Sequence, residues 1–242
     1  MPSYSAAFYR DLDRTASPSA ARVVPLVLDL VGAQSAVDVG CGDGSWLAAF
    51  SDAGVPEVLG LDGPWIAPNL LKIATRDFRR TKLEEPIRIE RRFELAMSVE
   101  VAEHLPPERA AGFVADLCAL APVVLFSAAI PGQGGEHHVN EQWPSYWSRL
   151  FAAHGYRASD VLRPAIWDDE QVAWWYRQNL VLFASGDACA RHPKLAAACL
   201  PEGRAPSPLV HPHCYAQVLR RTEPHFGRWL KMGPQSLRRR RR

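Results

Sequence analysis

The sequence predicts an α/β fold in which helices cover both faces of a doubly wound, mainly parallel β-sheet. Short apolar segments alternate with helical patterns over roughly 150 residues, and this order of elements builds such a sheet. The first apolar segment runs into a glycine-rich turn and a helix, as in folds that bind a ligand at the carboxyl ends of their strands. A chain of 242 residues is long enough to bury one substantial core.

The N-terminal part of the chain supplies the first elements of this pattern. Apolar residues recur at helical spacing over 5–15 and 20–32, and the second helix is expected to begin near Ser19. A short apolar strand at 36–39 and a helix at 45–53 follow, with the glycine-rich turn between them.

Strands and helices continue to alternate after this unit. A second strand at 57–62 ends in an acid and leads into a loop and a helix. The later elements are a strand at 93–99, a helix at 107–119, a strand at 123–127, a helix at 144–153 and two closing strands at 156–162 and 178–184. Only a short helix fits between the two closing strands.

The glycine-rich turn has the pattern D-x-G-x-G-x-G, formed by Asp38, Gly40, Gly42 and Gly44. Glycine lets the backbone turn sharply and lets a ligand lie against the main chain without meeting a Cβ atom. A dinucleotide fingerprint would need glycine at position 45, where the chain has Ser45. The spacing therefore argues against a dinucleotide and for another bulky ligand.

This pattern resembles motif I of the class I S-adenosylmethionine (SAM) dependent methyltransferases, and the resemblance covers residues 20–185. It implies a seven-stranded sheet that closes with an antiparallel hairpin. It also implies SAM as cofactor, with S-adenosylhomocysteine (SAH) as product. The residues expected to bind the cofactor are Asp38, Gly40, Cys41, Gly42, Gly44, Asp62, Gly63, Leu83 and Ser98.

The acid at the end of the second strand, Asp62, is expected to accept hydrogen bonds from both ribose hydroxyls. Asp38 is expected to support the glycine turn or to contact the methionine amino group. The adenine contact departs from the family pattern, because Lys82 stands where many members have an acid or amide and cannot accept that bond. The backbone of Leu83 and the side chain of Asp77 are the two alternatives.

An E-x-x-E-H pattern, Glu100, Glu103 and His104, follows the strand at 93–99. On a helical turn this spacing places two carboxylates and an imidazole on one face, a set that suits Mg²⁺ or Mn²⁺. The string resembles two methyltransferase groups that hold a divalent ion there, the ubiquinone-pathway catechol O-methyltransferases and the small-RNA terminal 2′-O-methyltransferases. Similar strings occur in metal-free members, where the histidine closes the pocket floor, so both interpretations stay open.

A loop at 131–143 carries a second group of polar side chains behind several glycines. In the RNA group a histidine from this loop is a further metal ligand, and the resemblance assigns that role to His138. Without a metal, one of the loop histidines is the candidate general base. The candidate catalytic residues are thus His104, His137, His138 and Glu141, and the candidate metal ligands are Glu100, Glu103, His104 and His138.

Charge separates an acidic body from a basic C-terminal segment. Residues 204–242 hold ten of the 28 basic side chains and one of the 26 acidic ones, so residues 1–203 carry a net charge of −7. This argues against a nucleic-acid groove across the main domain. We assign 1–186 to the methyltransferase domain and 187–242 to a proline-rich basic extension, with a disordered tail at 233–242 whose partner is left open.

The cysteines and the apolar runs of the sequence indicate the cellular compartment. The five cysteines are scattered without a C-x-x-C pair, which fits reduced thiols in the cytoplasm. No apolar run approaches the ~20 residues of a membrane span, and no signal-peptide pattern is visible. A homo-oligomer is compatible with these features.

The expected function is that of a SAM-dependent O-methyltransferase acting on a small polar acceptor, a sugar or a hydroxylated natural product. The string at 138–147 is similar to a bacterial group associated with glycan or secondary-metabolite tailoring. The alternatives are an RNA 2′-O-methyltransferase and a non-catalytic SAM-binding partner subunit. Aromatic faces suit such acceptors, and one of Trp174, Trp175 and Tyr176 is expected to face the pocket, whereas Trp147 is expected in the core.

Overall fold

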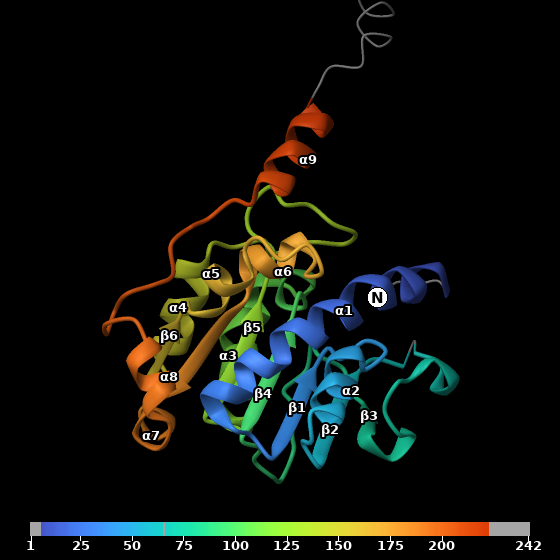
Figure 1. The fold of residues 1–242 in the computed structure, drawn as a ribbon. Coiled ribbons are helices and arrows are strands. Elements are labelled where there is room, and N and C mark those ends of the chain that lie inside the picture. Colours follow the sequence, from blue (N-terminus) through green and yellow to red (C-terminus); the bar gives the residue numbers. More distant parts are fainter. Residues whose placement is uncertain (1–5, 65, 223–242) are drawn as a thin grey trace, which may run out of the picture.

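The computed structural model describes residues 6–64 and 66–222 and contains one seven-stranded sheet of order β3-β2-β1-β4-β5-β7-β6 (Figure 1). The strands are β1 (Ser35–Val39), β2 (Glu57–Asp62), β3 (Phe78–Arg80), β4 (Leu95–Val99), β5 (Val123–Ser127), β6 (Tyr156–Ser159) and β7 (Val181–Ser185). The pairings from β1 to β5 are parallel, and β7 is antiparallel to both β5 and β6. The expected doubly wound sheet with its antiparallel final hairpin is confirmed.

Helices and short 3₁₀ turns connect the strands. The helices are α1 (Ala6–Val31), α2 (Ser45–Asp52), α3 (Ala110–Leu120), α4 (Pro144–Ala152), α5 (Leu162–Ile166), α6 (Trp174–Asn179), α7 (Gly186–Arg191), α8 (Pro193–Ala198) and α9 (Pro212–Thr222). The 3₁₀ turns are Pro68–Leu70, Thr75–Asp77, Ala102–His104 and Pro107–Arg109.

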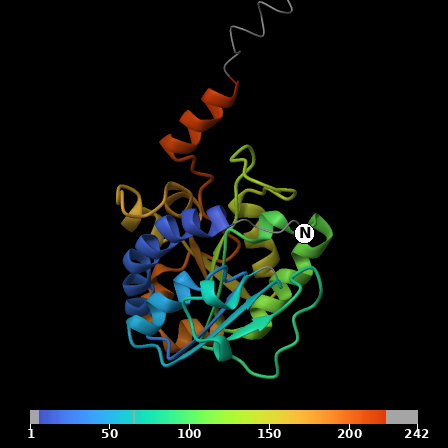
Figure 2. The same cartoon turned by 90° about the vertical axis from the view of Figure 1, so that its right-hand side faces the viewer.

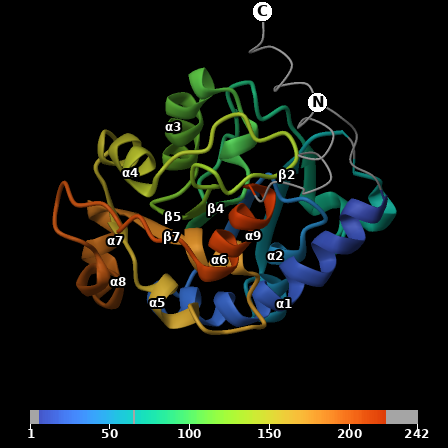
Figure 3. The ribbon, with the colours of Figure 1, turned by 90° about the horizontal axis from the view of Figure 1, so that it is seen from above.

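The sheet separates two apolar cores, because a strand points successive side chains to opposite faces. In β4, Leu95 and Met97 face the core that also holds residues of α1, α2 and α5 to α8, whereas Ala96 faces the core that holds residues of α3 and α4. Figures 2 and 3 show these helices on opposite faces of the sheet. Burial on both faces explains why the strands are nearly continuous apolar runs.

The site lies where the chain reverses its order across the sheet. From β1 the chain proceeds to β2 and β3 on one side, and β4 then pairs with the other side of β1. Ligands in such sheets bind in the crevice outside the carboxyl ends of the strands at this switch point. The glycine turn after β1 and the segment 100–104 after β4 both lie at this crevice.

The N-terminal region is one continuous helix, and the expected division into 5–15 and 20–32 is wrong. Ser19 does not cap a helix start; its hydroxyl donates to the carbonyl of Thr15 within α1 (2.6 Å). Pro18 lies inside the helix, at the usual cost of one backbone hydrogen bond. The buried apolar face of α1 continues on both sides of this proline, so packing outweighs that loss.

The boundaries of other elements also differ from those that the sequence predicts. The described residues between β2 and β3 form two 3₁₀ turns in place of a helix. The closing strands are shorter than 156–162 and 178–184: β6 ends before α5, and β7 begins after Gln178 and Asn179, which belong to α6. Both amides enter a buried polar network beside the cavity, a role that a strand assignment concealed.

The described part of the C-terminal extension packs against the sheet domain. Leu195 of α8 is fully buried in the core that also holds residues of α1 and α2. Cys199 forms an isolated antiparallel β-bridge with Ser159 at the end of β6. The expected disordered tail at 233–242 lies outside the described residues. Among the described helices, none combines the length and the apolar character that a bilayer crossing requires.

Two stacked phenylalanines give a test of this packing. Phe151 of α4 is fully buried, and its ring centroid lies 3.9 Å from that of Phe183 in β7. Phe151→Ala is expected to lower the free energy of unfolding by about 3–5 kcal/mol, because it leaves a cavity between α4 and the sheet. Urea denaturation followed by circular dichroism measures the loss. Arg149→Ala, on the exposed face of α4, is the control, with an expected change within about 0.5 kcal/mol; equal losses would contradict the packing.

Candidate active site

A cavity of about 430 Å³ opens at the carboxyl ends of β1, β2 and β4. Loop 131–143, α6 and α9 contribute to its wall. The polar and aromatic side chains along it include Asp38, Asp43, Asp62, Glu100, Glu103, His104, Gln133, Glu136, His138, Trp174, Trp175, Tyr176, Gln217 and Arg221. The cavity thus joins the glycine turn to the E-x-x-E-H segment and the histidine loop, as the sequence predicted.

The glycine turn forms one wall with bare backbone. Gly40 has φ +89°, and a Cβ atom built there would lie 2.4 Å from Cγ2 of Val101, so both its conformation and its surroundings require glycine. The amides of Gly40 and Cys41 donate to the carbonyl of Leu61 in β2, at 2.8 and 3.2 Å. These bonds fix the turn against the second strand, and Gly40, Cys41 and Gly42 line the cavity.

Asp62 faces this turn from the end of β2. Its carboxylate accepts from the amide of Gly42 (2.7 Å) through Oδ2 and from the amide of Gly63 (2.6 Å) through Oδ1. The side chain is buried and lines the cavity. Backbone donors therefore hold the carboxylate at the place where the family resemblance puts the ribose.

Asp38 lies deeper in the same wall, and its negative charge is not fully compensated there. It is 2% exposed, and its Oδ1 atom has no hydrogen-bond partner among the described residues. Burial, with Asp62 and Asp43 nearby, raises the pKa of Asp38 well above its usual value. A ligand with an ammonium group and a sulfonium centre would supply the missing positive charge, so this wall fits SAM.

The other expected cofactor residues divide into two groups. Leu83 lines the cavity whereas Asp77 does not, so of the two alternatives for the adenine contact only Leu83 is in reach. Gly44 and Gly63 lie outside the cavity lining, as does Ser98, whose hydroxyl donates to the carbonyl of Val39 (3.0 Å). These three support the turn and the strands around it.

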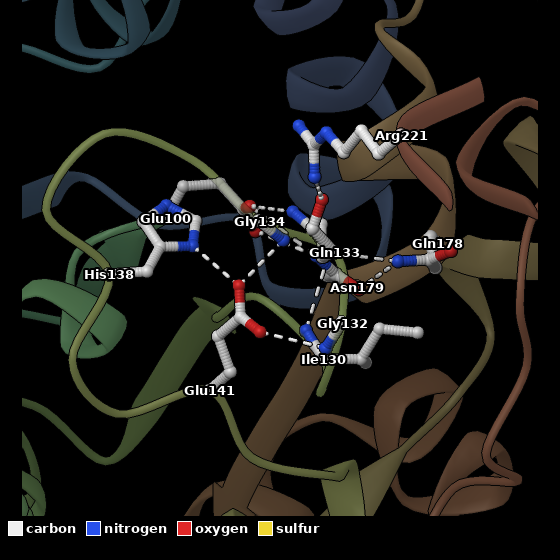
Figure 4. A network of polar contacts seen from close by, with 10 residues as sticks. All are labelled: Glu100, Ile130, Gly132, Gln133, Gly134, His138, Glu141, Gln178, Asn179 and Arg221. Carbon is white, nitrogen blue, oxygen red and sulfur yellow. Dashed lines mark hydrogen bonds and ion pairs between the residues drawn. The ribbon is translucent and has the colours of Figure 1, made fainter. Parts of the chain in front are cut away.

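The E-x-x-E-H segment does not present its three side chains together. Glu100 leaves β4 with φ +56°, and the 3₁₀ turn begins only at Ala102. The Glu100 carboxylate accepts from the side-chain amides of Gln133 (3.0 Å) and Asn179 (3.1 Å). Burial raises its pKa, and these hydrogen bonds oppose the rise. Glu100 is thus tied to loop 131–143 and α6, as Figure 4 shows.

Glu103 and His104 gather with His138 from the loop. One ligand atom from each lies within 4.8 Å of the other two. Glu103 is fully buried, and neither of its carboxylate oxygens has a hydrogen-bond partner among the described residues. Its pKa is raised well above the usual value by burial and by the nearby Glu100. Burial, aided by His138, lowers the pKa of His104 to about 4, so its imidazole is neutral near pH 7.

His138 is oriented by Glu141. Their Nδ1 and Oε1 atoms lie 2.9 Å apart, and the Glu141 carboxylate also accepts from the amides of Gly134 (2.6 Å) and Gly132 (2.8 Å) (Figure 4). Because a carboxylate only accepts, Nδ1 of His138 donates, and Nε2 is an acceptor whenever the ring carries a single proton. A Cβ atom on Gly135 would lie 2.2 Å from Nε2, so this ring position requires glycine there.

The structure separates the four candidate catalytic residues by position. His104 and His138 line the cavity, with their ring centroids 4.8 Å apart. Glu141 lies behind His138, and His137 is exposed with φ +59° outside the cavity lining. Trp174, Trp175 and Tyr176 all line the cavity, and Trp147 is buried as expected.

Several residues at or beside the cavity were not identified from the sequence. Gln133, Gln178 and Asn179 form a network in which Oε1 of Gln133 accepts from both other amides (2.9 Å each). A pair of polar residues just before a buried strand was the available signal for two of them. Gln217 and Arg221 reach the cavity from α9, and no local pattern in the sequence marks them.

Comparison with known proteins agrees with this geometry. A family model described as a methyltransferase domain matches residues 11–163. The chain belongs to this family and is a class I SAM-dependent methyltransferase. No curated protein matches the chain.

Solved structures share the fold at low sequence identity. Magnesium protoporphyrin IX methyltransferase (ChlM) from Synechocystis PCC 6803, with bound SAH, has a TM-score of 0.54 and 15% identity over 76% of this chain and 90% of its own. CalS10, an amino pentose methyltransferase from Micromonospora echinaspora, has a TM-score of 0.53 and 16% sequence identity, over 76% of this chain and 98% of its own. The methyltransferase domain of bacterial CtHen1-C has a TM-score of 0.51 and 18% sequence identity, over 71% of this chain and 100% of its own.

The geometry of Asp62 predicts the effect of removing it. Asp62→Ala is expected to weaken SAH binding about 100-fold or more, because the cofactor loses a charged acceptor and the glycine turn loses a support. Isothermal titration calorimetry with SAH measures the change. Asp77→Ala serves as the control, since Asp77 lies away from the cavity lining; equal SAH affinity of the two variants would contradict the assignment.

Proposed function

We propose that this methyltransferase transfers the methyl group to a hydroxyl of a small polar acceptor, a sugar or a hydroxylated natural product, in a cytoplasmic tailoring reaction. The observation that carries the proposal is the pair of His138 and Glu141 at the cavity. A hydroxyl is a weak nucleophile until its proton is removed, and a histidine held in one tautomer by a carboxylate is suited to that task.

Each side chain of the pair has a separate role. Bound SAM supplies an electrophilic sulfonium methyl group opposite the acceptor. Nε2 of His138 takes the proton that the hydroxyl loses as its oxygen bonds to the methyl carbon, while the methyl–sulfur bond breaks and its electron pair stays on sulfur, which leaves SAH. Glu141 keeps the imidazole oriented and stabilises the positive charge that the ring gains.

The acceptor half of the cavity also supports a small, flat or cyclic acceptor. Trp174 and Trp175 line it together with the amide of Gln217, and aromatic faces suit sugars and planar rings. The amino pentose methyltransferase among the similar structures agrees with such an acceptor.

A divalent metal is a second element of the proposal, favoured by the cluster of Glu103, His104 and His138. The buried Glu103 oxygens have no hydrogen-bond partner in the part of the chain that the structure describes, and one carboxylate with two imidazoles is a set that Mn²⁺ or Mg²⁺ accepts. Such an ion would lower the pKa of a hydroxyl and orient it. The same cluster is the observation that favours an RNA 2′-O-methyltransferase, which the acids along the cavity oppose.

Substitution of the histidine tests the proposed base. His138→Ala is expected to lower kcat by about 10²- to 10⁴-fold and to leave SAH affinity unchanged. Glu141→Gln is expected to lower kcat less, because Nε2 is still present. Transfer of a radiolabelled methyl group from SAM to a panel of pentoses, hexoses and catechols measures the rate. Full activity of His138→Ala would overturn the proposed base, and a failure of every hydroxyl to accept methyl would overturn O-methylation.

Metal dependence is tested separately. After treatment with a chelator, Mn²⁺ is titrated calorimetrically into the SAH-loaded chain, with binding expected in the wild type and lost in Glu103→Gln. Glu136→Gln is the control, since Glu136 lines the cavity outside the cluster. Full activity in chelator without Mn²⁺ binding would remove the metal and leave His138 as the base.

A further inference from the structure

Helix α9 places side chains from the C-terminal segment at the acceptor end of the cavity. It stands above loop 131–143 and α6 in Figure 1 and lies over α6 in the view of Figure 3. Its base is anchored, because the amide of His211 donates to Oε1 of Gln178 (2.8 Å) and the side chain of Cys214 is buried. The helix is therefore attached to the network beneath the loop.

Two residues of α9 share the face turned to the cavity. Gln217 and Arg221 are one helical turn apart, and both line it. Nη1 of Arg221 donates to the carbonyl of Gln133 (2.8 Å), as Figure 4 shows. Gly134, with φ +66°, makes room for this contact, since a Cβ atom there would lie 2.1 Å from Nη1.

The guanidinium of Arg221 has no acidic partner within 6–64 and 66–222. None of the ion pairs between the side chains that the structure describes includes it. Its hydrogen bond to the neutral carbonyl of Gln133 uses one of five N–H donors. Among the described lining residues Arg221 is also the single arginine, and no lysine accompanies it.

Arg221 and His138 flank the same short stretch of backbone. The carbonyl of Gln133 accepts from Arg221, and the next amide, that of Gly134, donates to the carboxylate that orients His138. A small acceptor whose hydroxyl lies at Nε2 of His138 can therefore extend toward the guanidinium. A planar guanidinium with free donors matches a carboxylate or a phosphate in charge and shape.

We propose that Arg221, with Gln217 beside it, binds an anionic group of the acceptor, so that the substrate is a hydroxylated small molecule carrying a carboxylate or a phosphate. This inference rests on the proposed methyl transfer to a hydroxyl at the same site. It gives α9 a role in choosing the acceptor, distinct from the binding of SAM by the glycine turn and Asp62.

The test uses the full chain saturated with SAH and pairs of probes, in which an anionic compound is matched with a neutral compound of similar structure. D-glucuronate and D-glucose 6-phosphate are compared with D-glucose, and 3,4-dihydroxybenzoate with 3,4-dihydroxybenzyl alcohol. Ligand-observed NMR titration measures the dissociation constants. In the wild type at least one anionic probe is expected to bind about tenfold more tightly than its neutral partner, and the carboxylate and phosphate arms identify which anion the site takes.

Variants of α9 assign the preference to one side chain. Arg221→Gln is expected to abolish the preference for the anion, Arg221→Lys to retain part of it, and SAH affinity to stay unchanged in both. Arg220→Gln is the matched control, because it removes the same charge from the neighbouring exposed position outside the cavity lining. A wild type without preference for any anionic probe, an unchanged preference in Arg221→Gln, or an equal loss in Arg220→Gln would each overturn the proposal.

Methyl transfer to the same probes keeps this inference separate from the proposed function. A preference that depends on Arg221 while no probe hydroxyl accepts methyl would support the anion site and count against the proposed O-methylation. Methylation of an anionic probe with equal KM in wild type and Arg221→Gln would support O-methylation and overturn the anion site. A rise in KM at constant kcat in Arg221→Gln is the expected result, since a purely structural change of the histidine loop would also lower kcat.

Discussion

The carboxylate of Glu100 is half-buried, and the elements around the cavity supply its hydrogen-bond donors. Gln133 donates from the histidine loop and Asn179 from α6. Gln178 then links Gln133 to the backbone amide of His211 at the start of α9. The loop, α6 and α9 are therefore held together at the end of β4 by one half-buried carboxyl group and the amides around it.

The cofactor end of the cavity is acidic, and this charge matches the ligand that it has to bind. Asp38 and Asp62 lie at the end formed by β1 and β2, where a cationic cofactor fits. SAH carries one positive charge fewer than SAM, so Asp38, whose Oδ1 atom has no hydrogen-bond partner among the described residues, attracts the product less than the substrate. The other end holds amides, aromatic rings and Arg221, together with the carboxyl groups of Glu103 and Glu136. Arg221 is the single arginine among the described lining residues, and no lysine accompanies it.

The cofactor half of the site could be predicted from sequence because it depends on local backbone geometry. Gly40 and Asp62 follow directly from a strand–turn–helix unit and the next strand end. The E-x-x-E-H segment was predicted less well, because Glu100 has a left-handed backbone and is held by Gln133 and Asn179. The candidate ligand cluster consists of Glu103, His104 and His138 instead. Arg221 had no signature at all, because its position depends on where α9 meets a loop almost ninety residues earlier in the chain.

Glu103 decides between the two ways in which the acceptor hydroxyl can be activated. Without a cation, burial and the nearby Glu100 favour its protonated form, and the neutral His104 beside it adds no compensating charge. A divalent ion would have to displace that proton, so metal binding and deprotonation of Glu103 are linked and strengthen together as pH rises. In that state His138 would use Nε2 as a ligand, and the nitrogen would no longer be available as a base. In the protonated state Nε2 remains an acceptor, held in place by Glu141. In the proposed mechanism the same three side chains would therefore support either a metal or a histidine base at any one time, and the proton on Glu103 would select between them.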